Sequence, residues 1–179
     1  MNGNRLFLLI AGLTLVAALL LTVWLNGATE KKGSAVALYR AQLYDMAGVR
    51  QPLKQWQHHV LIVQFWAPWC LPCRHSLSAL NTSQQPVVLI ALADKPQTAP
   101  ILAAQPIHFP VLLGDLETLS LLRRYGDPNM QLPFTLVIRP DDQIGASFIG
   151  SIGAPQLNAL VQKALHVSRT PPVRSPNKI

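Results

Sequence analysis

The longest apolar run of the chain lies near its beginning, at residues 6–25, where only two threonines interrupt it. About 20 helical residues span the hydrocarbon core of a bilayer, so this run predicts a transmembrane helix. A cleaved signal peptide is the alternative, but its apolar core is usually only about 7–15 residues long. No good cleavage site follows closely. The pattern therefore favours an uncleaved anchor.

Shorter apolar runs, rich in β-branched and aromatic residues, predict buried strands farther along the chain. The first is Val60–Trp66, preceded by a strand-like stretch at 41–46 and a turn at Gly48. Pro86 opens a second strand at 87–93, and a short apolar piece follows at 109–113. The last two predicted strands, 134–138 and 144–149, are joined by a polar turn and predict a hairpin.

Apolar residues at helical spacing alternate with these strands. They predict helices at 69–81, 116–125 and 154–167, and a weaker helix at 98–105 that Pro106 ends. Strands that alternate with helices are typical of parallel strands joined by crossover helices, here finished by an antiparallel pair. The fold class is therefore α/β.

A length of 179 residues suggests one domain with appendages. We divide the chain into the anchor with its polar linker, 1–32, a folded domain at 33–168, and a tail at 169–179. The tail is basic and rich in proline, so we expect it to be disordered.

Composition agrees with an anchored protein, because half of the residues are apolar and only 13% are charged. The net charge of +7 raises the question of a nucleic-acid partner. However, the basic residues are scattered and form no continuous stripe with interleaved aromatic residues. We expect no nucleic-acid partner, and we assign the charge to solubility and to attraction for anionic lipid near the anchor.

The chain has only two cysteines, Cys70 and Cys73, at the start of the helix predicted after the first buried strand. A cysteine at a helix N-terminus is favoured as the thiolate, because unpaired N–H groups and the helix dipole stabilise negative charge there. The second cysteine lies one turn into the helix, within reach of a disulfide formed by the first. Pro72 stiffens the first turn, where its missing N–H costs nothing.

The motif alone leaves other chemistries open. It could be half of a zinc site, a copper site completed by a histidine, or two inert buried thiols. No histidines lie at ligand spacing except the adjacent pair His58 and His59, which is more typical of an exposed turn. We therefore predict no metal and no cofactor, and we expect His75 to face solvent rather than act as a base.

The stretch VLIVQFWAPWCLPCRHSLSAL, residues 60–80, resembles the active-site strand and helix of thioredoxins. It is closest to the TlpA/ResA-like branch, which includes the CcmG/DsbE-type reductases of cytochrome c maturation. The segment 41–70 resembles the hairpin that precedes the active site in this family. Residues 132–135 resemble its cis-proline loop, and 138–150 the hairpin that follows. The resemblance covers about residues 35–167.

This resemblance implies a thioredoxin fold, a central mixed sheet flanked by helices. It implies that Cys70 is the attacking thiol and Cys73 the resolving thiol, and that Pro133 is cis and lies against the pair. Trp69 and Pro72 are expected to support the site. The activity implied is that of a protein-disulfide reductase on the periplasmic side of the inner membrane, supplied with electrons by a DsbD- or CcdA-like membrane donor.

The sequence departs from the family pattern at three places. Gln64 stands where thioredoxins have Asp, and Ser76 where this branch often has a Glu that helps move the proton of the resolving thiol. The segment 126–131, before the cis-proline loop, is also longer than usual. We expect these changes to affect rate, redox potential and choice of substrate more than the type of reaction.

Two other functions remain open from the sequence. One is a copper- or haem-handling metallochaperone that uses Cys70, Cys73 and a histidine such as His108. The other is a non-catalytic anchored binding module that keeps only the fold.

Overall fold

The computed structural model describes residues 12–13, 15–18, 21, 33–105 and 107–166. The chain divides into two compact units, Met1–Lys32 and Gly33–Ile179. Most of the predicted anchor and all of the predicted tail lie outside the described residues. Among the residues that are described, no helix is both long enough and apolar enough to cross a membrane.

Six strands of the second unit form one mixed sheet in the order β1-β4-β3-β2-β5-β6. The strands are β1 (Tyr44–Asp45), β2 (Leu61–Trp66), β3 (Val87–Ala91), β4 (Val111–Leu113), β5 (Phe134–Ile138) and β6 (Ile144–Ile149). Strands β2, β3 and β4 are parallel, whereas β5 and β6 continue the sheet as an antiparallel pair. The predicted parallel strands with a final hairpin are confirmed.

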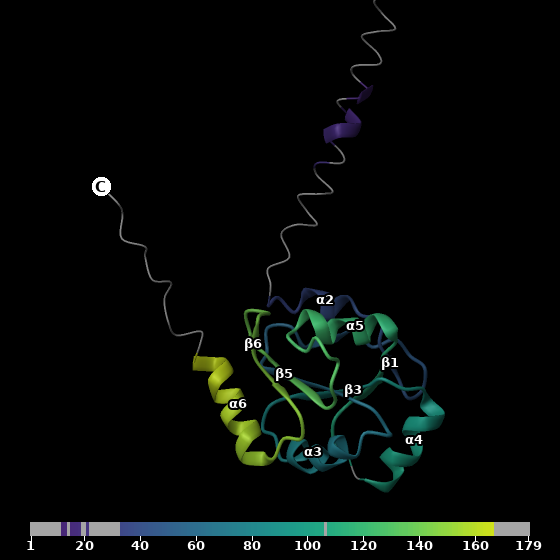
Figure 1. The fold of residues 1–179 in the computed structure, drawn as a ribbon, viewed down its shortest axis with the longest axis vertical. Helices are drawn as coiled ribbons and strands as arrows, with labels where there is room; N and C mark the ends of the chain where they lie inside the picture. Colours follow the sequence, from purple (N-terminus) through teal and green to yellow (C-terminus); the bar gives the residue numbers. More distant parts are fainter. Residues whose placement is uncertain (1–11, 14, 19–20, 22–32, 106, 167–179) are drawn as a thin grey trace, which may run out of the picture. The chain divides into compact units, whose positions relative to one another are not determined.

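Helices cover both faces of this sheet (Figure 1). They are α2 (Val36–Arg40), the 3-10 helix η1 (Leu53–Trp56), α3 (Leu71–Asn81), α4 (Lys95–Ala104), α5 (Leu116–Arg124) and α6 (Ala154–His166). Helices α2 and α5 pack on one face, and α3 and α6 pack on the other. The prediction of an α/β fold with a central mixed sheet is therefore confirmed.

Strand β2 lies inside the sheet, paired with β3 on one side and β5 on the other, and every one of its residues is buried. Side chains alternate between the two faces of a strand. Val63 and Phe65 therefore pack beneath α2 and α5, whereas Ile62 and Trp66 pack beneath α3 and α6. This two-sided burial explains why the strand is apolar at every position except Gln64.

The structure differs from the sequence prediction mainly before β2 and after β3. Helices α2 and η1 were not predicted, because each is too short to show a helical period. Helix α4 begins at Lys95 rather than near Thr98, since the Asp94 side chain accepts a hydrogen bond from Gln97 N at 3.0 Å and caps the helix. Gly48, with φ of 82°, forms the predicted turn.

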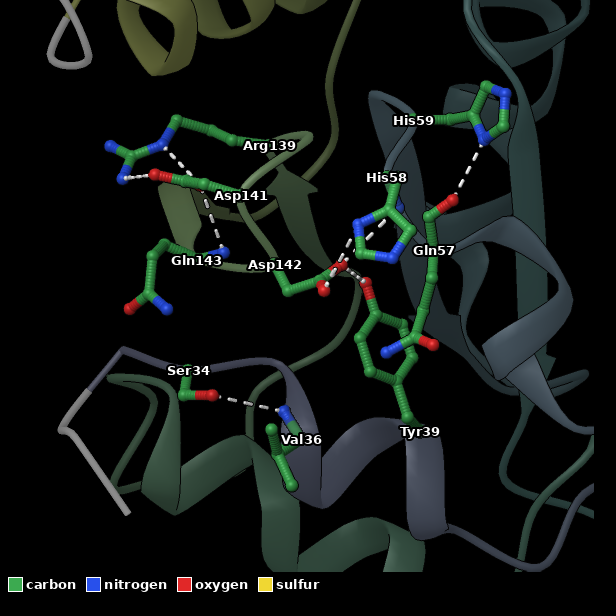
Figure 2. Close-up of polar contacts among 10 residues, drawn as sticks. All are labelled: Ser34, Val36, Tyr39, Gln57, His58, His59, Arg139, Asp141, Asp142 and Gln143. Carbon is green, nitrogen blue, oxygen red and sulfur yellow. Dashed lines mark hydrogen bonds and ion pairs between the residues drawn. The ribbon is translucent and has the colours of Figure 1, made fainter. Parts of the chain in front are cut away.

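A cluster of polar side chains joins three segments at the end of the sheet where β2 begins. Figure 2 shows the Tyr39 hydroxyl and the His58 ring pointing toward the carboxylate of Asp142. The hydroxyl donates a hydrogen bond of 2.9 Å, and the His58 Nδ1 lies 3.6 Å from the other carboxylate oxygen. Asp142 lies in the turn between β5 and β6, so the cluster ties that turn to α2 and to the segment before β2.

Candidate active site

The two cysteines lie where β2 ends and α3 begins. Residues 67–70 lead from the strand into the helix, and Cys70 is the N-cap of α3. The carboxyl-terminal ends of β3 and β4 lie at the same end of the sheet as that of β2, because the three strands run parallel. In an open sheet of this kind, this end is where ligands usually bind.

Cys70 and Cys73 form a disulfide, with their Cα atoms 5.3 Å apart. The Cys70 Sγ also accepts a hydrogen bond of 3.2 Å from the N–H of Cys73. This N–H lies in the first turn of the helix and also donates to the carbonyl of Cys70 at 3.1 Å, and an N–H placed here stabilises a thiolate on the same sulfur. The structure therefore confirms that the first cysteine lies at the helix N-terminus and the second one turn into the helix.

The two cysteines and their neighbours differ in their exposure to solvent. Cys70 is 9% exposed and Cys73 is fully buried. The neighbouring Trp69 and Leu71 are 66% and 61% exposed, which is unusual for large apolar side chains. Cys70 is therefore the more exposed of the two cysteines, and its neighbours in the chain on both sides are exposed apolar residues.

Pro133 immediately precedes β5, and the bond between Leu132 and Pro133 is cis, as the resemblance predicts. Phe134 pairs with Phe65 near the end of β2, which brings the cis-proline loop to the same edge of the sheet as the cysteines. The carbonyl of Pro133 accepts a hydrogen bond of 2.8 Å from Gly150 N.

Two departures from the family pattern, Gln64 and Ser76, are both fully buried. The Gln64 Nε2 donates a hydrogen bond of 2.9 Å to Thr135 Oγ1, while its Oε1 has no partner among the described residues. The Ser76 Oγ accepts a hydrogen bond of 3.0 Å from Ile152 N. Each of these side chains therefore links the centre of the site to another element, and neither carries the negative charge of the acid that it replaces.

Two side chains next to the cysteine pair on α3, those of Arg74 and His75, do not support a direct role in the chemistry. Arg74 is half-buried and donates from Nη2 to the carbonyl of Pro68 at 2.9 Å, so it fastens the helix start to the preceding turn. His75 is exposed, as predicted.

The loop between α5 and β5 contains a buried acid that the sequence analysis missed. Asp127 is fully buried, and neither carboxylate oxygen has a hydrogen-bond partner within the described part of the chain. Its backbone is well fixed, because its N–H donates to Leu122 O and its carbonyl accepts from Met130 N. Asp commonly occurs in turns, so its burial here was not evident from the sequence.

Residues 33–105 and 107–166 contain no group of three His, Cys, Asp or Glu side chains arranged to hold a metal ion. A cavity of about 600 Å³ lies beside β1 and β4, at the far edge of the sheet. Trp56, Leu102 and Phe109 contribute to its lining, which includes neither cysteine. This cavity is therefore separate from the candidate active site.

Comparison with solved structures identifies the fold. A thioredoxin-related protein from Neisseria meningitidis serogroup B is 25% identical and covers 70% of this chain and 99% of its own length, with a TM-score of 0.62. A Chlorobium tepidum protein described as a thiol:disulfide interchange protein DsbE is 26% identical over 70% of this chain and 90% of its own, with a TM-score of 0.57. The chain has a thioredoxin fold.

StoA from Bacillus subtilis, at 19% identity and a TM-score of 0.52, shares the fold. No protein-family model and no curated protein matches the sequence. The resemblance to thioredoxin-related and DsbE-type proteins is nevertheless confirmed by these structures together with the bonded pair of Cys70 and Cys73. These findings support thiol–disulfide oxidoreductase activity.

Proposed function

We propose that this chain is a membrane-anchored thiol–disulfide oxidoreductase that reduces protein disulfides in an extracytoplasmic compartment. The observation that carries the proposal is the disulfide between Cys70, the N-cap of α3, and the buried Cys73. A cysteine pair at a helix N-terminus can alternate between a disulfide and a dithiol whose outer sulfur is stabilised as the thiolate.

In the proposed reaction, the Cys70 thiolate attacks one sulfur of a substrate disulfide. A bond forms between Cys70 and the substrate, the substrate's own S–S bond breaks, and the departing thiolate takes up a proton. Cys73 then attacks the Cys70 sulfur, which forms the intramolecular disulfide and releases the second substrate thiol with the proton that Cys73 lost. Two electrons have passed to the substrate, so the bonded pair in the structure corresponds to the oxidised product of one turnover.

The order of attack follows from exposure. Cys70 is the more accessible of the two sulfurs, and Cys73 N–H already donates to it. Cys73 is fully buried, so we assign it the second step, attack on the Cys70 sulfur of the mixed disulfide. Trp69 and Leu71 offer apolar contacts to a protein substrate beside the reacting sulfur.

The proposal places the domain outside the cytoplasm, anchored in the inner membrane through residues 6–25. Its support is the length of that apolar run, together with the persistence of protein disulfides, the proposed substrates, in oxidising compartments. A reductase in such a compartment must be recharged, and we propose a DsbD- or CcdA-like membrane dithiol as the electron donor. The proposed substrates are proteins with disulfides, of the kind reduced during cytochrome c maturation.

The test is reduction of insulin by the full chain in detergent micelles, with a small dithiol as electron source. Wild type should accelerate insulin reduction, and Cys70→Ser should not. The reduction potential decides the direction: a value near about −270 mV indicates a reductant and one near about −120 mV an oxidant. Tight Cu(I) binding by the reduced chain without insulin reduction would instead support a metallochaperone. If the chain neither bound Cu(I) tightly nor reduced insulin, a non-catalytic binding module would be supported.

A further inference from the structure

The short segment after β6 hydrogen-bonds to both elements that flank the cysteine pair. Its first residue, Gly150, donates its N–H to the carbonyl of Pro133 at 2.8 Å. Two residues later, the N–H of Ile152 is donated to Ser76 Oγ at 3.0 Å. Pro133 belongs to the cis-proline loop and Ser76 to helix α3. Residues 150–152 therefore join the cis-proline loop to the helix that begins at the cysteines.

Ser76 differs in its bonding from the other hydroxyls around α3. Ser78 Oγ donates to His75 O at 3.4 Å, and Thr82 Oγ1 donates to Ala79 O at 2.8 Å, so each bonds back to a carbonyl of the same helix. Ser76 Oγ instead accepts a hydrogen bond from another element. Serines in helices often bond back to a carbonyl of their own helix, whereas the Ser76 hydroxyl connects α3 to the segment after β6.

Burial makes this contact demanding. Ser76 is fully buried and Ile152 is 1% exposed, packed in the core between the sheet, α3 and α6. A buried N–H that loses its acceptor carries the whole cost of desolvation. Removal of the Ser76 hydroxyl therefore favours movement of residues 150–152, and Gly150 would carry that movement to Pro133.

We propose that Ser76 is a positioning residue that, through residues 150–152, sets the cis-proline loop relative to the cysteine pair. The inference rests on the proposed function. A protein substrate has to lie against both the cis-proline loop and the apolar surface around Cys70, so its reduction depends on their relative position. A small disulfide needs only to reach the sulfur of Cys70, so its reduction does not.

The experiment compares Ser76→Ala with Ser78→Ala in the full chain in detergent micelles. Each variant reduces insulin and, separately, bis(2-hydroxyethyl) disulfide, with a small dithiol as electron source. In Ser76→Ala we expect kcat/KM for insulin to fall about tenfold, mainly through KM, a factor that corresponds to about 1.4 kcal/mol. The rate with the small disulfide should change by less than about twofold, the scale of an independent site. Ser78 is exposed, and its alanine variant should match wild type with both substrates.

A second variant reaches the same segment from its other end. Gly150 has φ of 107°, which disfavours a side chain, while a Cβ there would have no neighbour within 4 Å. Gly150→Ala should therefore disturb the backbone without a clash and give the same selective loss on insulin, even if Ser76→Ala fails to fold.

Equal losses on the two substrates in a folded variant, or no loss on either, would overturn the inference. If wild type reduced neither insulin nor the small disulfide, the proposed function itself would be overturned, so the two failures are distinguishable.

Discussion

The two ends of the central strand β2 are built in different ways. Where β2 ends, backbone N–H groups donate hydrogen bonds around the cysteine pair: Cys73 N–H to the Cys70 sulfur, Gly150 N–H to the Pro133 carbonyl, and Ile152 N–H to Ser76 Oγ. Where β2 begins, side chains hold the structure, because Tyr39 and His58 converge on Asp142 (Figure 2). The first arrangement leaves reactive sulfur atoms beside exposed apolar residues, whereas the second fixes neighbouring elements. We therefore expect substitutions at the first end to change activity and those at the second to change stability.

The largest expected effect is at the cysteine end. Cys70→Ser removes the sulfur that we propose attacks the substrate, so insulin reduction by the full chain should fall to the background rate of the small dithiol alone. The free energy of unfolding of the reduced protein should change little, because serine has nearly the shape of cysteine.

Cys73→Ala is the matched variant, since it keeps the proposed attacking sulfur of Cys70 and removes the sulfur proposed to resolve the mixed disulfide. It should accumulate a covalent complex with its substrate, visible as a mass increase that a reductant reverses. A Cys70→Ser variant as active as wild type would contradict the proposed chemistry.

At the opposite end, Tyr39→Phe removes the hydroxyl that donates to Asp142 at 2.9 Å. Hydrogen bonds to a charged group contribute about 1.5–3 kcal/mol, so the free energy of unfolding should fall by about that amount. Urea unfolding of the full chain in micelles, followed by tryptophan fluorescence, measures this change. Insulin reduction per folded molecule should stay at the wild-type value, and a loss of activity with unchanged stability would reverse the comparison.

The same tyrosine predicts a dependence on high pH. Burial, followed by the hydrogen bond to Asp142, raises the pKa of Tyr39 above its ordinary value. The folded state therefore holds this proton more tightly than the unfolded state. Its contribution to stability is complete below about pH 10, the ordinary tyrosine pKa, and is lost as the pH rises further.

Urea unfolding at a series of pH values should show a steeper fall above about pH 10 in wild type than in Tyr39→Phe. The variant serves as the control, because lysines and other tyrosines titrate in both proteins. Parallel curves would show that Tyr39 titrates alike in the folded and unfolded chain.

The sequence predicted the parts of the fold that depend on local pattern. Strand β2 is buried on both faces and is therefore apolar except at Gln64, and β5 and β6 are joined by a polar turn. Cys70 and Cys73 were found because their chemistry needs two sulfurs within one helical turn. The cis form of Pro133 was expected from the family resemblance, since nothing local to that loop distinguishes it from a trans proline.

The features that sequence analysis missed depend on contacts between distant segments. The hydrogen bond of Ser76 joins residues 76 positions apart, and no pattern near either residue predicts it. Likewise, Asp142 receives Tyr39 from a position 103 residues away. The predicted anchor and tail stay predictions, because they fall largely or wholly outside the described residues.

The smallest expected effect lies in the turn next to this cluster. Arg139 holds Asp141 through two contacts, Nε to Oδ1 at 3.0 Å and Nη2 to Oδ2 at 2.7 Å. The hydrogen bonds from Arg139 lower the pKa of Asp141 below its ordinary value, so their contribution to stability is present above about pH 4 and is lost as the pH falls. The Asp141 side chain is 51% exposed, and solvent screening limits such a pair to about 0.5 kcal/mol.

Asp141→Asn keeps an acceptor for Gln143 N, so urea unfolding at pH 7 should show a loss of only about this size, with insulin reduction unchanged. A loss as large as that of Tyr39→Phe would show that the turn itself, and not the Tyr39–Asp142 contact, holds this end of the sheet together.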